Sequence, residues 1–143
     1  MFNGEYAHTI DDKGRFTMPT KLRDALRDGF YITRGLDGCL NMYDSEQWKV
    51  FEAKLATLPT TNKSARDFVR FFVSGAVDSV YDKQGRVLLP PNLREYAKLD
   101  KDIIIAGVIT HCEIWDAAAW QEKQKGVVGN IDELTEQMSD FGV

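Results

Sequence analysis

Apolar residues recur at two spacings along this chain of 143 residues, and the spacings predict two kinds of element. Alternation of apolar and polar positions predicts a half-buried strand, and a short continuous apolar run favours a buried one. Such stretches are EYAHTID (5–11), FYITRG (30–35), CLNMYD (39–44), GAVDSVYD (75–82), DIIIAG (102–107) and CEIWD (112–116). Two shorter runs, RFTM (15–18) and RVLL (86–89), lead directly into a proline, which has no N–H to give to a ladder. We therefore expect each proline to end a short strand.

Apolar residues three and four positions apart predict the helices. TKLRDALRDG (20–29) and PNLREYAKLD (91–100) each begin at one of these prolines, which suit a first helical turn. A longer helix is expected after Asp44, which is placed to cap it, and another over residues 65–73, where the apolar stripe is clean.

The helical pattern is weaker near the C-terminus. Asp116 is placed to cap a helix that carries Trp120, and two glycines, Gly126 and Gly129, are expected to break it. A last amphipathic stretch has Ile131, Leu134, Met138 and Phe141 on one side.

The chain repeats its own pattern after 71 positions. The charged turn DDKGRFTMP (11–19) returns as DKQGRVLLP (82–90), and one inserted residue then moves the offset to 72. The matching pairs include Gly4 and Gly75, Asp11 and Asp82, Gly14 and Gly85, Arg15 and Arg86, Pro19 and Pro90, Arg23 and Arg94, Asp44 and Asp116, and Trp48 and Trp120. So many ordered matches indicate an internal duplication.

We therefore divide the chain into a first copy (1–58), a connecting helix (59–72), a second copy (73–125) and an acidic helical tail (126–143). Neither copy is large enough to bury much core, so the two are expected to share one core around an approximate two-fold axis. The predicted fold is α+β: crossed β-hairpins from both copies close a small barrel, and the helices lie outside it.

Charge is distributed unevenly. Net charge is −4, and residues 130–143 account for it with four acidic and no basic side chains. The remaining body is neutral, but the two charged turns lie in locally basic segments. Residues 11–27 carry Lys13, Arg15, Lys21, Arg23 and Arg27 against three acids, and residues 82–98 carry Lys83, Arg86, Arg94 and Lys98 against two. This is a faint footprint of the kind that nucleic-acid-binding proteins show more strongly.

Compartment signals are few. The start MFNGEYAHTIDD has neither the basic residues nor the apolar run of a signal peptide, and the longest apolar stretch, IIIAGVI, is too short to span a bilayer. Two cysteines, Cys39 and Cys112, do not make a disulfide framework. We expect a cytoplasmic protein with no membrane partner.

The spacing D-x-x-x-R around a glycine brings a carboxylate and a guanidinium onto the two arms of one hairpin. One interpretation is a cross-strand ion pair that secures the register. The other is that Asp11 and Asp82 orient the arginine forks of Arg15 and Arg86 towards phosphate or a guanine edge in a major groove. A two-stranded ribbon is narrow enough to enter that groove, and a repeated weak patch gains avidity in an oligomer. Both interpretations stay open at this point.

The motifs MFNGEY, DDKGRFTMP and LRDAL, with the second DKQGRVLLP, resemble the MraZ transcriptional regulators, relatives of the AbrB/SpoVT swapped-hairpin DNA-binding proteins. The resemblance covers nearly the whole chain. It implies a swapped-hairpin barrel, a nucleoid-associated location, a ring-like oligomer, and binding to direct repeats upstream of a division and cell-wall operon that the protein usually represses.

The family's DNA contacts map onto Asp11, Lys13, Gly14 and Arg15 in the first copy. In the second copy they map onto Asp82, Gly85 and Arg86, with Lys83 adjacent. Gln84 stands where the first copy has Lys13, so the resemblance implies that the first copy is the more dependable reader of bases.

The remaining candidate chemistry is sparse. His8, His111, Cys39 and Cys112 lack the spacing of a metal site, so no metal or cofactor is expected. Trp48 and Trp120 could stack on bases, although their helical spacing favours the core or an interface. No nucleophile elbow or phosphate loop is present, so we expect no enzyme. A protein-interaction module on the same barrel, with its arginines binding acidic partners, is the alternative function.

Overall fold

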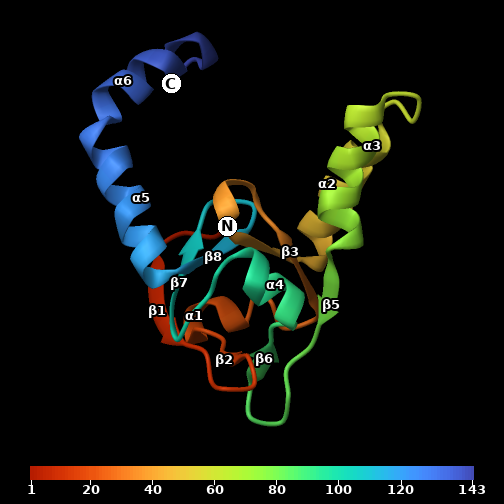
Figure 1. Ribbon diagram of the computed structural model, residues 1–143, viewed down its shortest axis with the longest axis vertical. Helices are drawn as coiled ribbons and strands as arrows, with labels where there is room; N and C mark the ends of the chain where they lie inside the picture. Colours follow the sequence, from red (N-terminus) through yellow and green to blue (C-terminus); the bar gives the residue numbers. More distant parts are fainter.

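Eight strands form the body of the protein, and two helical arms leave it on the same side (Figure 1). The computed structural model describes residues 1–143. Residues 11–15 and 82–86, the two charged turns, lie at the end of the body opposite the arms (Figure 1). The predicted α+β class is confirmed.

Six of the strands form one antiparallel sheet in the order β1-β7-β8-β4-β3-β5. Their bounds are β1 Glu5–Thr9, β3 Phe30–Arg34, β4 Leu40–Asp44, β5 Val77–Ser79, β7 Asp102–Gly107 and β8 Cys112–Asp116. The other two, β2 (Arg15–Thr17) and β6 (Arg86–Leu88), form a separate antiparallel pair. Every predicted strand is present, although β5 is shorter than its sequence pattern suggested.

The strands on either side of each charged turn do not pair with each other, contrary to the predicted hairpins. β1 pairs with β7, β5 pairs with β3, and β2 pairs with β6. Each of these ladders joins a strand from residues 1–58 to a strand from residues 73–125. The six-stranded sheet therefore draws strands from both predicted copies: the pairs β3–β4 and β7–β8 lie within one copy, and the other ladders join the two copies.

The predicted closed barrel is not formed. β1 and β5 are the two edges of the six-stranded sheet, and no ladder joins either edge to β2 or β6. The reason lies in the length of the second pair. β2 and β6 are three residues long, and Pro19 and Pro90 follow within two residues of their ends, so each strand reaches only the other.

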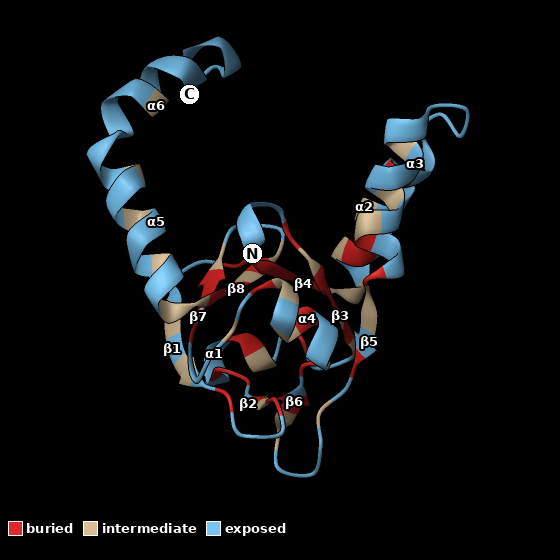
Figure 2. Ribbon diagram, viewed as in Figure 1, coloured by how far each residue is buried: buried red, intermediate tan, exposed pale blue.

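The core is one cluster to which both predicted copies contribute (Figure 2). Its fully buried members include Phe16, Leu26, Phe30 and Ile32 from the first copy, and Val87, Leu89, Leu93, Ile103 and Ile114 from the second. Burial of each such side chain contributes about 1.5–3 kcal/mol. Sharing the cluster explains how two small units reach a stable core.

The helices that follow the prolines are shorter than predicted. α1 covers Thr20–Arg23 and α4 covers Pro91–Tyr96. The chain continues as turns, and the amide of Leu26 still donates to the carbonyl of Leu22, so Leu26 reaches the core without a longer helix.

Both predicted capping aspartates are confirmed. Asp44 accepts a hydrogen bond from the amide of Gln47 at 2.7 Å and begins α2 (Ser45–Ala56). Asp116 accepts one from the amide of Ala119 at 3.1 Å and begins α5 (Ala117–Gly129). The expected break at Gly126 was wrong, because α5 runs through it, as an isolated glycine inside a helix is tolerated at modest cost.

One arm is a helical hairpin of α2 and α3 (Lys63–Val69), extended by a π-helical turn over Arg70–Ser74. Trp48 and Phe72 are buried at its base, where Trp48 stacks on Tyr31. The other arm is α5 followed by α6 (Ile131–Met138) and a 3-10 turn, Ser139–Phe141. None of the helices combines the length and the apolar character needed to cross a bilayer.

Candidate nucleic-acid interface

The first charged turn is ordered by the carboxylate of Asp11. Its Oδ1 accepts the backbone N–H groups of Lys13 and Arg15, at 3.0 and 2.9 Å. Its Oδ2 accepts the side-chain Nε of Arg15 at 2.8 Å. Gly14 closes the turn by donating to the carbonyl of Asp11, with a φ of +87° that favours glycine. One side chain thus sets both the backbone of the turn and the direction of the arginine.

The second turn repeats this geometry. Oδ1 of Asp82 accepts the backbone N–H groups of Gln84 and Arg86 at 2.9 and 2.8 Å, and Oδ2 accepts Nε of Arg86 at 2.9 Å. Gly85 has a φ of +74° and donates to the carbonyl of Asp82. The predicted ion pairs therefore exist, but each orders a turn tip instead of crossing a hairpin ladder.

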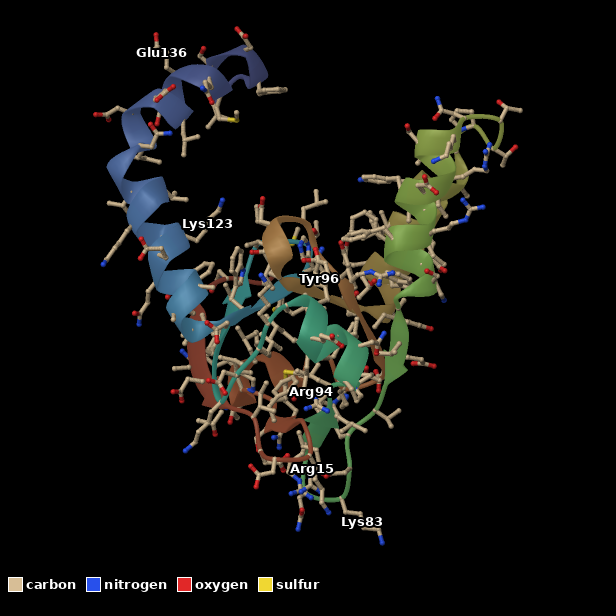
Figure 3. All side chains as sticks on the ribbon, in the orientation of Figure 1. Arg15, Lys83, Arg94, Tyr96, Lys123 and Glu136 are labelled. Carbon is tan, nitrogen blue, oxygen red and sulfur yellow. The ribbon has the colours of Figure 1, made fainter.

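The two turns meet through the β2–β6 ladder (Figure 3). Side chains alternate across it, so Phe16 and Val87 point into the core while Arg15 and Arg86 lie on the other face. Nη1 of Arg86 approaches Oδ2 of Asp11 at 3.9 Å. The structure thus brings together Asp11, Arg15, Asp82 and Arg86, which the sequence had placed only in pairs.

The two arginines are held but not enclosed. The side chains of Arg15 and Arg86 are 29% and 28% exposed. Because each aspartate engages the Nε edge, the terminal nitrogens of Arg15 have no hydrogen-bond partner within the chain. Those of Arg86 are less free, since Nη1 faces Asp11. A guanidinium fixed at one edge can offer its other edge to a guanine base or a phosphate oxygen.

Lys13 and Lys83 lie beside the arginines at the turn tips, where both are exposed and form no ion pair within the chain. Figure 3 shows Lys83 at the extreme end of the molecule. Gln84 takes the backbone place of Lys13, since its amide makes the same bond to the turn aspartate. The second tip therefore carries its lysine one position earlier.

A groove of about 640 Å³ opens beside the first turn. Its charged lining comprises Arg15, Arg86, Arg94 and Lys101 with Asp11, Asp12 and Asp100. The groove therefore offers both donors and acceptors, the two kinds of group that a base edge also presents.

Backbone hydrogen bonds lower the pKa of both turn aspartates. For Asp11 the amide of Arg15 is the main cause, and for Asp82 it is the amide of Arg86, with the guanidinium adding to each. A carboxyl group whose pKa is lowered by folding stabilises the folded turn at any pH above its ordinary pKa of 3.8. That contribution is lost only as pH falls through the depressed value.

We therefore expect both turns to keep their order, and DNA binding to show no step from these carboxylates, between about pH 5 and 8. An NMR titration that follows the side-chain carboxyl carbons of Asp11 and Asp82 measures this directly. Titration of either group above pH 3.8 would contradict the geometry.

Sequence reasoning missed the role of Arg23 and Arg94, which it counted only as part of the basic segments. In the structure each guanidinium packs against the glycine of the turn from the other predicted copy. The sequence did contain one signal: Arg23 and Arg94 are matching positions of the repeat, and they follow Gly14 and Gly85 at the same spacing along the chain.

The other candidate residues lie away from the turns. Cys39 and Cys112 are buried, and burial raises the pKa of both thiols to about 12. His111 stacks on Tyr43, and no three side chains of metal-binding type gather anywhere. Trp48 is in the core, as expected, and Trp120 packs on Trp115 and donates Nε1 to Glu5 at 2.8 Å.

Comparison with known proteins gives a consistent match. The family described as "MraZ protein, putative antitoxin-like" matches residues 1–71 and again 72–140. The chain is 50% identical to a protein of Clostridium beijerinckii, 49% to one of Thermoanaerobacter sp. (strain X514), and 50% to one of Moorella thermoacetica. Each alignment covers the full length of both chains, and each relative is named "Transcriptional regulator MraZ".

Proposed function

Because this chain belongs to the MraZ family, we propose that it is a sequence-specific DNA-binding transcriptional regulator whose two charged turns contact the double helix. One observation carries the proposal. The same aspartate-held arginine occurs twice, on neighbouring turns at one end of the molecule, where both guanidinium groups are accessible. An exposed ion pair stabilises a fold weakly, so stability is a poor reason for building it twice.

In this proposal the first turn reads bases. Asp11 holds Nε of Arg15, and the terminal nitrogens of Arg15 are free to bind O6 and N7 of a guanine in the major groove. Lys13 contacts phosphate, and Gly14 lets the backbone turn tightly at the tip. The second turn, with Asp82, Lys83, Gly85 and Arg86, contributes mainly backbone contacts, since Arg86 is already drawn towards Asp11.

The proposed ancestry of the fold is a duplicated AbrB-like swapped hairpin, with copies at 1–58 and 73–125. The exchange of strands between these segments supports it. The repeated turn geometry also supports it, since the same bonds order both turns, as an approximate two-fold relation between the copies would require.

We further propose that copies of the chain assemble head to tail into a ring. α6 extends away from the body (Figure 1), and Ile131, Met138 and Phe141 on the apolar side of this segment are 51%, 42% and 75% exposed. An isolated helix of eight residues is unstable in water, so it needs a packing partner.

The other arm offers a complementary surface. A groove of about 300 Å³ between α2 and α3 is lined by Leu55, Leu58 and Val69, with Arg66 and Arg70 beside them. The segment of α6 and the following turn is acidic, through Asp132, Glu133, Glu136 and Asp140. Apolar and charged groups therefore match between the two arms. Contact between unlike surfaces repeats from copy to copy and can close into a ring.

A ring presents many turn pairs at once, which suits several short direct repeats in a promoter. We propose that the target lies upstream of the protein's own division and cell-wall operon and that binding represses it. The protein would then act in the cytoplasm at the nucleoid, with no catalytic role.

The test is binding of the intact protein to DNA from upstream of its own gene, measured by fluorescence anisotropy against shuffled DNA of the same composition. We expect at least a ~1000-fold preference in about 0.15 M salt, typical of specific regulators. Equal binding to both DNAs would exclude a sequence-specific regulator and favour the protein-interaction alternative.

A further inference from the structure

The tip of the first turn is braced by an arginine from the other predicted copy. Gly14 is buried, and a Cβ built on it would lie 2.6 Å from Nε and 2.7 Å from Cζ of Arg94. Arg94 belongs to α4, far from the turn in sequence. Its planar guanidinium therefore lies directly against the glycine that forms the tip.

Hydrogen bonds continue this brace. Nε of Arg94 donates to the carbonyl of Leu89 at 3.0 Å, and the amide of Leu89 donates to the carbonyl of Gly14 at 2.8 Å. The guanidinium, the backbone of Leu89 and the turn tip thus form a connected series. This series fixes the backbone from which the side chain of Arg15 projects.

The second turn has a similar but looser arrangement. A Cβ on Gly85 would lie 3.0 Å from Nη2 of Arg23, and that nitrogen donates to the carbonyl of Met18 at 3.3 Å. No backbone bond from Met18 to Gly85 matches the bond from Leu89 to Gly14. Gly85 is also less buried than Gly14. The first turn is therefore the more firmly held of the two.

We propose that Arg94 is a positioning residue for the first turn: it holds the Gly14 tip so that Arg15 meets DNA in a set direction. The second copy thereby controls the reading side chain of the first. The consequence for DNA rests on the proposed function, whereas the ordering of the turn does not. Arg23 serves the second turn in the same way, with a smaller effect.

The first experiment needs no DNA. Amide hydrogen exchange is compared by NMR in wild type, Arg94→Ala, Arg94→Lys and Arg23→Ala. We expect exchange at Leu89 and Arg15 to quicken about tenfold in both Arg94 variants, since lysine has the charge but no planar Nε donor. Arg23→Ala should instead affect Arg86. Unchanged exchange at Leu89 and Arg15 in the Arg94 variants overturns the proposal. If Arg94→Ala does not fold, as judged by thermal unfolding, Arg94→Lys carries the test.

The second experiment separates positioning from direct contact. Affinity for a DNA that carries a single repeat, on which Arg15→Ala is expected to lose only about 10- to 100-fold, is measured for wild type, Arg15→Ala, Arg94→Ala and the double variant over a range of salt concentrations. If Arg94 acts through the turn, its replacement lowers affinity about tenfold in wild type and less than about twofold in the Arg15→Ala background. The salt dependence of binding should stay the same.

Two results together would identify Arg94 as a phosphate ligand and overturn the proposal. The first is that the two single substitutions weaken binding additively. The second is that the salt slope falls by about 0.9 for each phosphate that the variant no longer neutralises. If wild type shows no promoter preference, the proposed function fails, while the exchange experiment still decides whether Arg94 orders the turn.

Discussion

Replacing Arg15 with alanine is expected to lower promoter affinity by about 10- to 100-fold for each engaged chain, since a bidentate arginine–guanine contact discriminates by that order. In a ring that engages several repeats the losses multiply, so specific binding should become undetectable. Non-specific binding should weaken little, because the variant removes one charge among several at this end of the molecule. Fluorescence anisotropy on promoter and shuffled DNA measures both quantities.

Two variants complete this experiment. Arg27→Ala is the matched control, because its side chain is 72% exposed and makes only a 3.7 Å contact with Asp28. It should bind as wild type does. Arg86→Ala should lie between the two, since its guanidinium faces Asp11. Wild-type affinity in Arg15→Ala would show that the first turn does not read DNA. If Arg27→Ala lost as much promoter affinity as Arg15→Ala, net charge alone would explain the effect.

Replacing Leu134 with aspartate is expected to convert the proposed ring into monomers. The substitution places a charge on the apolar side of α6. In the assembled ring this charge would have to be buried, without an ionic partner, in the groove of the next copy. Loss of the ring should reduce apparent affinity for repeated promoter sites by about 100- to 10,000-fold, with little change for a single repeat. Analytical ultracentrifugation and anisotropy give the two readouts.

The head-to-tail arrangement can be tested by mixing. Leu58→Asp places a charge in the groove between α2 and α3 and leaves α6 unchanged. Leu134→Asp places a charge on the apolar side of α6 and leaves the groove unchanged. Each variant alone should be monomeric, and an equimolar mixture should form dimers and nothing larger. Leu134→Met, which keeps the apolar side, is the control and should retain the ring. A ring in either aspartate variant, or no dimer in the mixture, contradicts the proposed contact.

Much of the local structure follows from the chain alone. The strands, the capping roles of Asp44 and Asp116, and the helical conformation over residues 65–73 depend on residues close in sequence. The apolar stripe of that helix is buried only at Phe72, because Phe68 and Val73 stay exposed. The turn bonds of Asp11 and Asp82 also lie within five residues, so the repeated D-x-x-x-R spacing was enough to predict that each carboxylate meets its own arginine.

The pairing of strands that lie far apart in the chain could not be predicted from these local patterns. Period-two patterns show which residues of a strand face the core, but they do not name the neighbouring strand. The sequence therefore suggested that β1 pairs with β2 across the turn, whereas β1 pairs with β7 and β2 with β6. The shortness of β2 and β6, which leaves the sheet open, likewise appears only when both strands lie together.

The sequence alone therefore determines the repeated turn and its arginine, because every bond that shapes the turn joins residues close in the chain. The contact between the two turns is long-range. Asp11 near Arg86, and Arg94 against Gly14, are contacts between residues far apart in the chain. Such contacts arise from the shared core that pulls both copies together, and no short-range pattern encodes them. The local sequence specifies two arginines, each held by its own aspartate, and the packing of the whole chain brings them onto one surface.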